Sequence, residues 1–183
     1  PAEIRLHSVA VDVAPQSRAG GNFNYFASSV LESRLDVARA VANVTLPGGN
    51  MLTARVLAGC NAVVFETSSR VSMTPCAASF LPTSKGGTHG DIEWVLTTVP
   101  GDEDWPGMSF ALAHAARGAR HVVTAVTSLE AKDPVATAVT LAGNVLGEDT
   151  VKQVAAHEAV WGEFWSKSGV ALADNYLESV WYR

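Results

Sequence analysis

Residues 51–67 read MLTARVLAGCNAVVFET and hold two strand-like runs around one turn. Residues 51–57 and 62–67 are rich in β-branched side chains, and Gly59 and Asn61 mark the turn between them. Two such runs joined by a short turn predict a pair of adjacent antiparallel strands.

Further strand-like runs lie on both sides of this pair. Residues 3–13 are close to an alternation of apolar and polar positions, the pattern of a half-buried strand. The other runs are enriched in Val and Thr and end at turn residues about every ten positions; they cover 35–46, 71–81, 91–99, 108–114 and 121–129. Strands do not alternate with helices there, so the predicted fold class is mainly β, an antiparallel β-sandwich.

Helix signals begin only after residue 131. Asp133 is an N-cap acid, and Pro134 follows it at the first helical position. A second helix is predicted from Thr150, which fits a capping box with Gln153, and Asp174 is the predicted cap of a third. We therefore predict three units: a β-sandwich domain at 1–131, a helical linker at 132–168 and the start of a further helical domain at 169–183.

The C-terminal segment is unusually rich in aromatic rings. Six of the fourteen Phe, Trp and Tyr residues lie between residues 161 and 183, and each such ring buries about 150–250 Å² when it packs. Spacings of three and four place several of them on one helix face. Within this stripe His157 is favoured as a hydrogen-bonded core histidine, with a ligand as the alternative. We expect the segment to contact a further domain, so that the chain is part of a larger protein, through His157, Trp161, Phe164, Trp165, Trp181 and Tyr182.

Composition narrows the classes of function. The 183 residues are 48% hydrophobic and 17% charged, with a net charge of −5; this suits a globular chain with one core domain, and no apolar run reaches the roughly 18 residues of a membrane span. Lys and Arg are scattered singly, so nucleic acid is not an expected partner. The sequence contains neither the nucleophile-elbow motif nor a phosphate-binding loop motif, and no cofactor is predicted. Residues 86–88 are predicted to be a loose glycine turn.

The two cysteines and the N-terminal residues add no evidence for a particular function. Cys60 and Cys76 lack metal-ligand spacing, and two small buried side chains are favoured over a disulfide between them. The chain begins at Pro1 without an initiator Met or a signal region, which indicates a cleaved or truncated start.

One short motif carries metal-binding residue types. His89, Asp91 and Glu93 would share one face of a single strand, because side chains alternate with a period of two. Such a set could ligate a divalent metal or perform acid–base chemistry. The alternative is the solvent face of an amphipathic strand.

An acidic loop at residues 100–107 carries Trp105 between carboxylates. Trp105 with Asp102 and Asp104 could stack on a sugar ring and hydrogen-bond its hydroxyls. The alternative is a solvated turn, or one whose Trp folds back onto the sandwich.

The C-terminal motif resembles a known family. The pattern His157-x-x-x-Trp161-x-x-Phe164-Trp165-x-x-Ser168, then Leu177-Glu178-x-x-Trp181-Tyr182, is similar to the junction in multidomain glycoside hydrolases of the family 95 alpha-L-fucosidase kind. Residues 34–44, 53–65 and 122–137 resemble sandwich strands and the first linker helix of that family. The resemblance covers most of residues 34–183, and the linker motif is its specific part.

This resemblance implies a β-supersandwich and helical linker that pack against an (α/α)6 barrel. The family's catalytic acid and base lie in the barrel, so no catalytic residue is expected in these 183 residues, and the parent would be an inverting glycosidase. The sandwich is shorter here than in the family. A secreted or periplasmic location, and carbohydrate as the partner of the parent enzyme, are implied by the resemblance alone.

Two other functions stay open. One is a free-standing carbohydrate-binding or protein-interaction β-sandwich whose C-terminal aromatics form a homodimer face. The other is a small metal-dependent enzyme centred on His89, Asp91 and Glu93.

Overall fold

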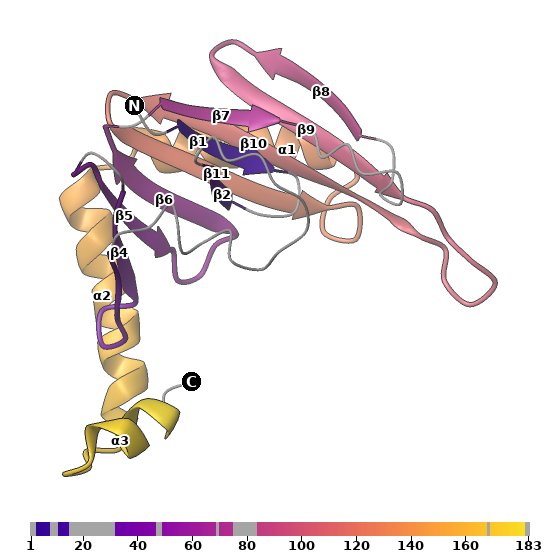
Figure 1. Ribbon diagram of the computed structural model, residues 1–183. Helices are drawn as coiled ribbons and strands as arrows, with labels where there is room; N and C mark the ends of the chain where they lie inside the picture. Colours follow the sequence, from indigo (N-terminus) through magenta and orange to yellow (C-terminus); the bar gives the residue numbers. More distant parts are fainter. Residues whose placement is uncertain are drawn as a thin grey trace.

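The computed structural model describes residues 3–7, 11–14, 32–46, 49–68, 70–74, 84–167 and 169–181. The strands are β1 Glu3–His7, β2 Val11–Ala14, β3 Glu32–Asp36, β4 Val41–Thr45, β5 Met51–Val56, β6 Ala62–Thr67, β7 Arg70–Thr74, β8 Ser84–His89, β9 Ile92–Val99, β10 Met108–Arg117 and β11 Arg120–Thr127. The helices are α1 Pro134–Gly147, α2 Thr150–Lys167 and α3 Asn175–Trp181. The chain is thus mainly β with C-terminal helices, which confirms the predicted fold class (Figure 1).

In the described part of the chain, eight strands form one antiparallel sheet, the main sheet, in the order β3-β4-β5-β6-β11-β10-β9-β8. The pair predicted at 51–57 and 62–67 is the hairpin β5–β6, in which Ala54 pairs with Phe65. Strand β11 returns from far along the chain and pairs Val122 with Val64 of β6. It therefore joins the hairpins β3–β6 to the later strands β8–β10.

Two runs predicted as single strands are hairpins. Residues 3–13 contain β1 and most of β2, which pair antiparallel with Ile4 opposite Val13. Residues 35–46 contain the end of β3 and all of β4, around a turn at which Ala40 has a positive φ of 45°. A period of two continues through such a reversal, so alternation alone does not reveal it.

Residues 86–88 are not a turn: they lie in the edge strand β8, contrary to the prediction. Gly87 pairs with Trp94 of β9. A Cβ built on Gly87 would lie only 2.6 Å from Cζ2 of Trp94. The indole therefore lies across the glycine and supplies the packing surface that a glycine in a strand lacks.

Helix α1 covers one face of the main sheet, over β9, β10 and β11 (Figure 1). Strand β10 meets it with the small buried side chains of Ala111, Ala113 and Ala115, which allow a close approach. Thr124 of β11 donates its buried hydroxyl to the carbonyl of Ala138 at 2.8 Å. The polar group is thus satisfied inside the core, as buried polar groups must be.

A second layer lies on the opposite face. Strands β2, β1 and β7 form a three-stranded sheet, the small sheet, in which β1 runs parallel to β7. Val71 and Met73 of β7 pack against a cluster of Leu46, Leu52 and Phe65 from the main sheet. The two sheets make the β part of the chain sandwich-like.

The helix starts are largely as predicted. Asp133 caps α1 by accepting the Ala136 N–H at 3.0 Å. The predicted cap of α2 is off by one residue, because Asp149, not Thr150, accepts the Lys152 N–H, at 2.9 Å. An ionised Asp is as good an N-cap as Thr, and Thr150 becomes the first helical residue.

Helices α2 and α3, together the connector, lead away from the sandwich. The far end of α2 extends beyond the sheet, and α3 lies across that end (Figure 1). Among the described residues, no helix combines the length and the apolar character that a membrane span requires.

Candidate docking site on the connector helix

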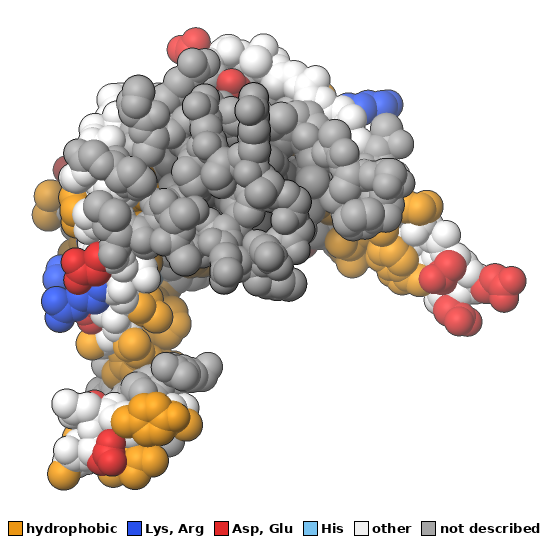
Figure 2. Space-filling model, viewed as in Figure 1, with side chains coloured by type: hydrophobic (Ala, Val, Ile, Leu, Met, Phe, Trp, Pro, Cys, Tyr) orange, Lys and Arg blue, Asp and Glu red, His pale blue; other side chains and the backbone are white. Residues whose placement is uncertain are grey.

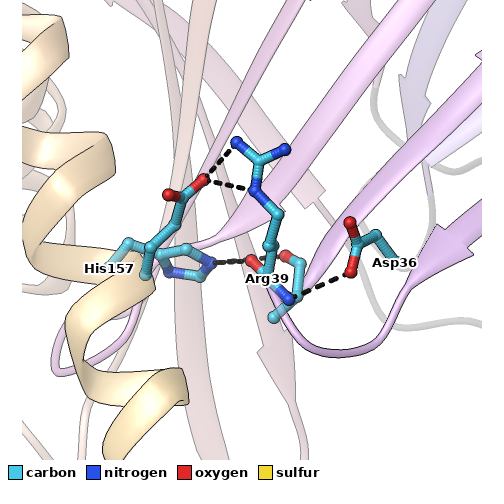
Figure 3. Close-up of polar contacts among 5 residues, drawn as sticks. Asp36, Arg39 and His157 are labelled. Carbon is cyan, nitrogen blue, oxygen red and sulfur yellow. Dashed lines mark hydrogen bonds and ion pairs between the residues drawn. The ribbon is translucent and has the colours of Figure 1, made fainter.

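His157 fastens α2 to two turns of the sandwich. The ring is buried, with 2% of the residue exposed. Its Nδ1 accepts the Ala58 N–H at 3.3 Å. Its Nε2 faces the carbonyls of Arg39 and Ala40 at 3.1 and 3.3 Å (Figure 3). These partners require a neutral ring with its hydrogen on Nε2. His157 is therefore a hydrogen-bonded core histidine, the role that the sequence favoured.

An ion pair on the surface reinforces this contact. Glu158 accepts from Nε and Nη2 of Arg39 at 2.9 and 2.7 Å, and the Arg39 N–H donates to Asp36 at 3.2 Å (Figure 3). Exposed pairs of this kind contribute at most about 1 kcal/mol. The buried ring of His157 is thus the stronger constraint on the position of α2.

Arg120 fixes the elbow between α1 and α2. Its guanidinium donates to the side chains of Thr150 and Gln153, the latter at 2.5 Å, and to the carbonyls of Val145 and Glu148 at 3.3 and 3.4 Å. The forked group binds the end of one helix and the start of the next to the beginning of β11. Arg120 was not singled out from the sequence, where it is one of several isolated cations.

The aromatic residues of α2 divide into inner and outer positions. Trp165 donates its indole N–H to the Val37 carbonyl at 2.9 Å and is partly buried. Trp161 is partly buried as well, and its ring centroid lies 5.6 Å from that of Phe164. Phe164 packs edge-on against Trp165 but is 52% exposed. The predicted interface is therefore turned partly inward, towards the chain's own sandwich.

Further large apolar side chains are exposed along the connector, where Figure 2 shows hydrophobic atoms along α2 and α3. We call those beyond His157 the apolar connector face; it comprises Val160 and Phe164 of α2, Leu172, and Tyr176, Leu177 and Val180 of α3. Tyr176 is 70% exposed. Trp181 ends α3, and the predicted interface residue Tyr182 lies outside the described residues.

The predicted metal-binding set does not share a face. His89 ends β8, Gly90 and Asp91 form the turn, and Glu93 belongs to β9. His89 pairs with Ile92, which packs towards α1, whereas its neighbour Glu93 points to the other face. The assumption of one continuous strand was wrong, and the described residues contain no group of three or more His, Cys, Asp or Glu placed to hold a metal ion.

The predicted sugar-contact residues lie at the tip of the long β9–β10 hairpin, whose acidic end Figure 2 shows projecting from the molecule. Asp102 accepts the N–H groups of Asp104 and Trp105 at 3.0 and 2.8 Å, so its carboxylate holds the loop together. Trp105 is 36% exposed. A sugar contact there stays a prediction.

A pair of buried histidines, with a half-exposed glutamate beside it, escaped the sequence analysis. Nδ1 of His114 lies 3.3 Å from Oε2 of Glu93, and Nε2 lies 3.1 Å from Nδ1 of His121. The His121 ring stacks between Phe65 and His114, with centroids 5.1 and 5.4 Å apart. We call Glu93, His114 and His121 the histidine cluster. The signal was present, because a tight turn after Arg117 places both histidines on the same face of the β10–β11 hairpin.

Burial and charge act together in this cluster. Burial lowers the pKa of His121 to about 4, and repulsion from His114 acts in the same direction.

Among the cysteines, Cys60 is a free, partly buried thiol, and its burial and the nearby Glu148 raise its pKa. Cys76 lies outside the described residues.

The fold and the connector define a sandwich-like module with an exposed helical extension. Comparison of the chain with protein-family models, with curated proteins and with solved structures finds no match in any of the three.

Proposed function

We propose that this chain is a non-catalytic β-sandwich module with a connector that packs against a helical catalytic domain in a carbohydrate-active glycoside hydrolase. The supporting observation is the two-sided nature of α2. His157 and Trp165 hold one side on the sandwich, whereas Phe164 on another side exposes half of its surface. An element anchored on one side and apolar on another suits a position between two domains.

The exposed residues favour a helical partner. Val160 and Phe164, and likewise Tyr176 and Val180, are four residues apart on their helices and exposed. Rows of side chains with this spacing form ridges that fit the grooves of other helices. The resemblance of the motif at 157–168 to the alpha-L-fucosidase-like junction implies a partner of the same kind, an (α/α)6 barrel.

The proposal is tested by expressing the helical segment encoded after codon 183 as a separate chain together with residues 1–183. We expect the two chains to purify as a 1:1 complex, and we expect Phe164→Glu to prevent the complex, because it places a charge in an apolar contact. Leu129→Glu is the matched control, since Leu129 is 74% exposed in the turn after β11, outside the connector.

Either of two results overturns the proposal. One is a reading frame that stops after codon 183. The other is a helical segment that folds but does not associate with residues 1–183.

A second candidate is a carbohydrate-binding sandwich. It rests on Trp105, which is 36% exposed and stands on a loop that Asp102 holds together. Calorimetric titration of residues 1–183 with fucosylated oligosaccharides tests it. Binding that Trp105→Ala removes and Leu129→Ala retains would favour this candidate, and an absence of heat would reject it.

A further inference from the structure

The two rings of the histidine cluster are buried on the face of the main sheet that meets the small sheet, whereas the carboxylate of Glu93 reaches solvent, with 48% of its side chain exposed. Phe65, which stacks on His121, packs in the same cluster as Val71 and Met73 of the small sheet. Strand β7 also approaches β9, which carries Glu93. Strands β11 and β10, which carry the two buried histidines, run between β6 and β9 in the main sheet, and the small sheet lies over these strands (Figure 1).

Apart from this cluster, that face of the main sheet carries no charge among the described side chains. Residues paired across neighbouring strands lie on the same face of a sheet. The register of the eight strands therefore identifies every residue that shares a face with the cluster. Val71 and Met73, the described side chains of β7, are apolar as well. In the described part of the chain, Glu93, His114 and His121 are therefore the only titratable side chains on this face.

The cluster can stabilise one additional proton, but a second proton would destabilise it. A single imidazolium can be shared between the rings with Glu93 as its counter-charge, since the three groups form one hydrogen-bonded row. Two protons would place like charges on nitrogens 3.1 Å apart, in a buried layer, and would remove the acceptor of the bond between the rings. Both effects push the rings apart.

We propose that the histidine cluster makes the sandwich acid-sensitive, holding the small sheet on the main sheet at neutral pH and releasing it when both imidazoles are protonated. The direction follows from linkage. Because the pKa of His121 is lowered in the closed state, the opened state binds the second proton more tightly, and acid favours opening. This inference concerns the sandwich itself and does not depend on the proposed function.

Hydrogen exchange measured by mass spectrometry on the 183-residue chain, at about pH 7 and about pH 4.5, tests the proposal. After correction for intrinsic exchange at each pH, peptides from β1 and β7 are expected to lose protection on the order of tenfold or more. Peptides from β10 and α1 are expected to keep theirs, because β10 stays paired with β9 and β11 and covered by α1 when the small sheet leaves.

Three variants separate the cluster from general acid effects. His121→Phe keeps a stacked ring but cannot titrate, so the protection of β1 and β7 should no longer depend on pH in this range. Glu93→Gln removes the counter-charge, which should move the opening to higher pH even if His121→Phe fails to fold. His89→Gln, at an exposed histidine that ends β8, should behave like the unmodified chain.

Two outcomes overturn the proposal. In the first, β1, β7, β10 and α1 lose protection together, which is acid unfolding of the whole molecule. In the second, the small sheet opens at the same pH in Glu93→Gln as in the unmodified chain, which assigns the titration to other groups.

Discussion

The neutral imidazole of His157 forms hydrogen bonds with three backbone groups at once. Its Nδ1 accepts one N–H, and its single Nε2–H is shared between two carbonyls. Replacing it by Leu leaves the Ala58 N–H and the carbonyls of Arg39 and Ala40 buried without their partner. The position of α2 therefore depends on one ring more than on the ion pair beside it.

We predict that His157→Leu lowers the free energy of unfolding by about 1–3 kcal/mol, the cost of buried polar groups that lose their hydrogen bonds. Urea denaturation measures it. His89→Leu, at an exposed histidine, should change the value by no more than about 0.5 kcal/mol. Equal effects of the two substitutions would contradict the structural role of His157.

Glu130 closes the turn between β11 and α1. Its carboxylate accepts from the N–H and hydroxyl of Thr127 at 2.8 and 2.9 Å, and from Nδ2 of Asn61 at 2.8 Å. These bonds, chiefly the one from the Thr127 N–H, lower the pKa of Glu130. A carboxyl with a lowered folded-state pKa contributes stability at neutral pH that is lost as the pH falls through that pKa.

We predict that the Glu130 carboxyl titrates below the ordinary value of a glutamate. Carbon-detected NMR of the side chain measures the midpoint directly. Asn61→Ala should raise the midpoint because it removes one donor, and Thr127→Val should raise it because it removes another. A midpoint that neither substitution moves would show that these bonds are absent in solution.

Replacing glycine by alanine is expected to have opposite effects on stability in β8 and in α2. In β8, Gly87 lies under the indole of Trp94, and a Cβ would come within 2.6 Å of it. In α2, a Cβ at Gly162 would meet nothing within 4 Å. The same substitution by alanine therefore tests packing in the strand and backbone entropy in the helix.

We predict that Gly87→Ala destabilises the chain by about 1–3 kcal/mol, the cost of overpacking a tight contact. Gly162→Ala should stabilise it by roughly 0.5–1 kcal/mol, because alanine is the better helix former. Thermal unfolding of both variants provides the comparison. A stabilising Gly87→Ala would mean that Trp94 does not lie over β8.

For the whole molecule, the apolar connector face has a measurable consequence. Large exposed apolar surfaces bind partners, self-associate or bind hydrophobic dyes. We predict that residues 1–183 alone dimerise or enhance the fluorescence of such a dye. Phe164→Ser with Leu177→Ser should reduce either signal by more than half, whereas Leu129→Ser should not, as sedimentation and dye titration would show. A dye-free monomer at high concentration would contradict the exposure of this face.

The sequence predicted those features whose causes are local. The hairpin β5–β6, the cap at Asp133 and the helical course of α1 and α2 all follow from neighbouring residues. Strand β8 was missed because Gly87 is stabilised by Trp94 on the next strand, and the histidine cluster because His114 and His121 meet only in the register of a hairpin. The hydrogen bond from Trp165 to Val37 joins positions far apart in the chain, and no pattern within either segment indicates it.

The parallel pairing of β1 with β7 has a consequence for the order of folding. Ile4 lies opposite Val71, so the small sheet cannot form until the chain between them has been closed into a loop. The hairpins β3–β4 and β5–β6 lie within that loop and need only short-range closure. Contacts between distant residues form slowly. We therefore expect these two hairpins to form before the N-terminal strands pair with β7, so that during refolding the small sheet shields the face carrying His114 and His121 from water only after the hairpins have formed.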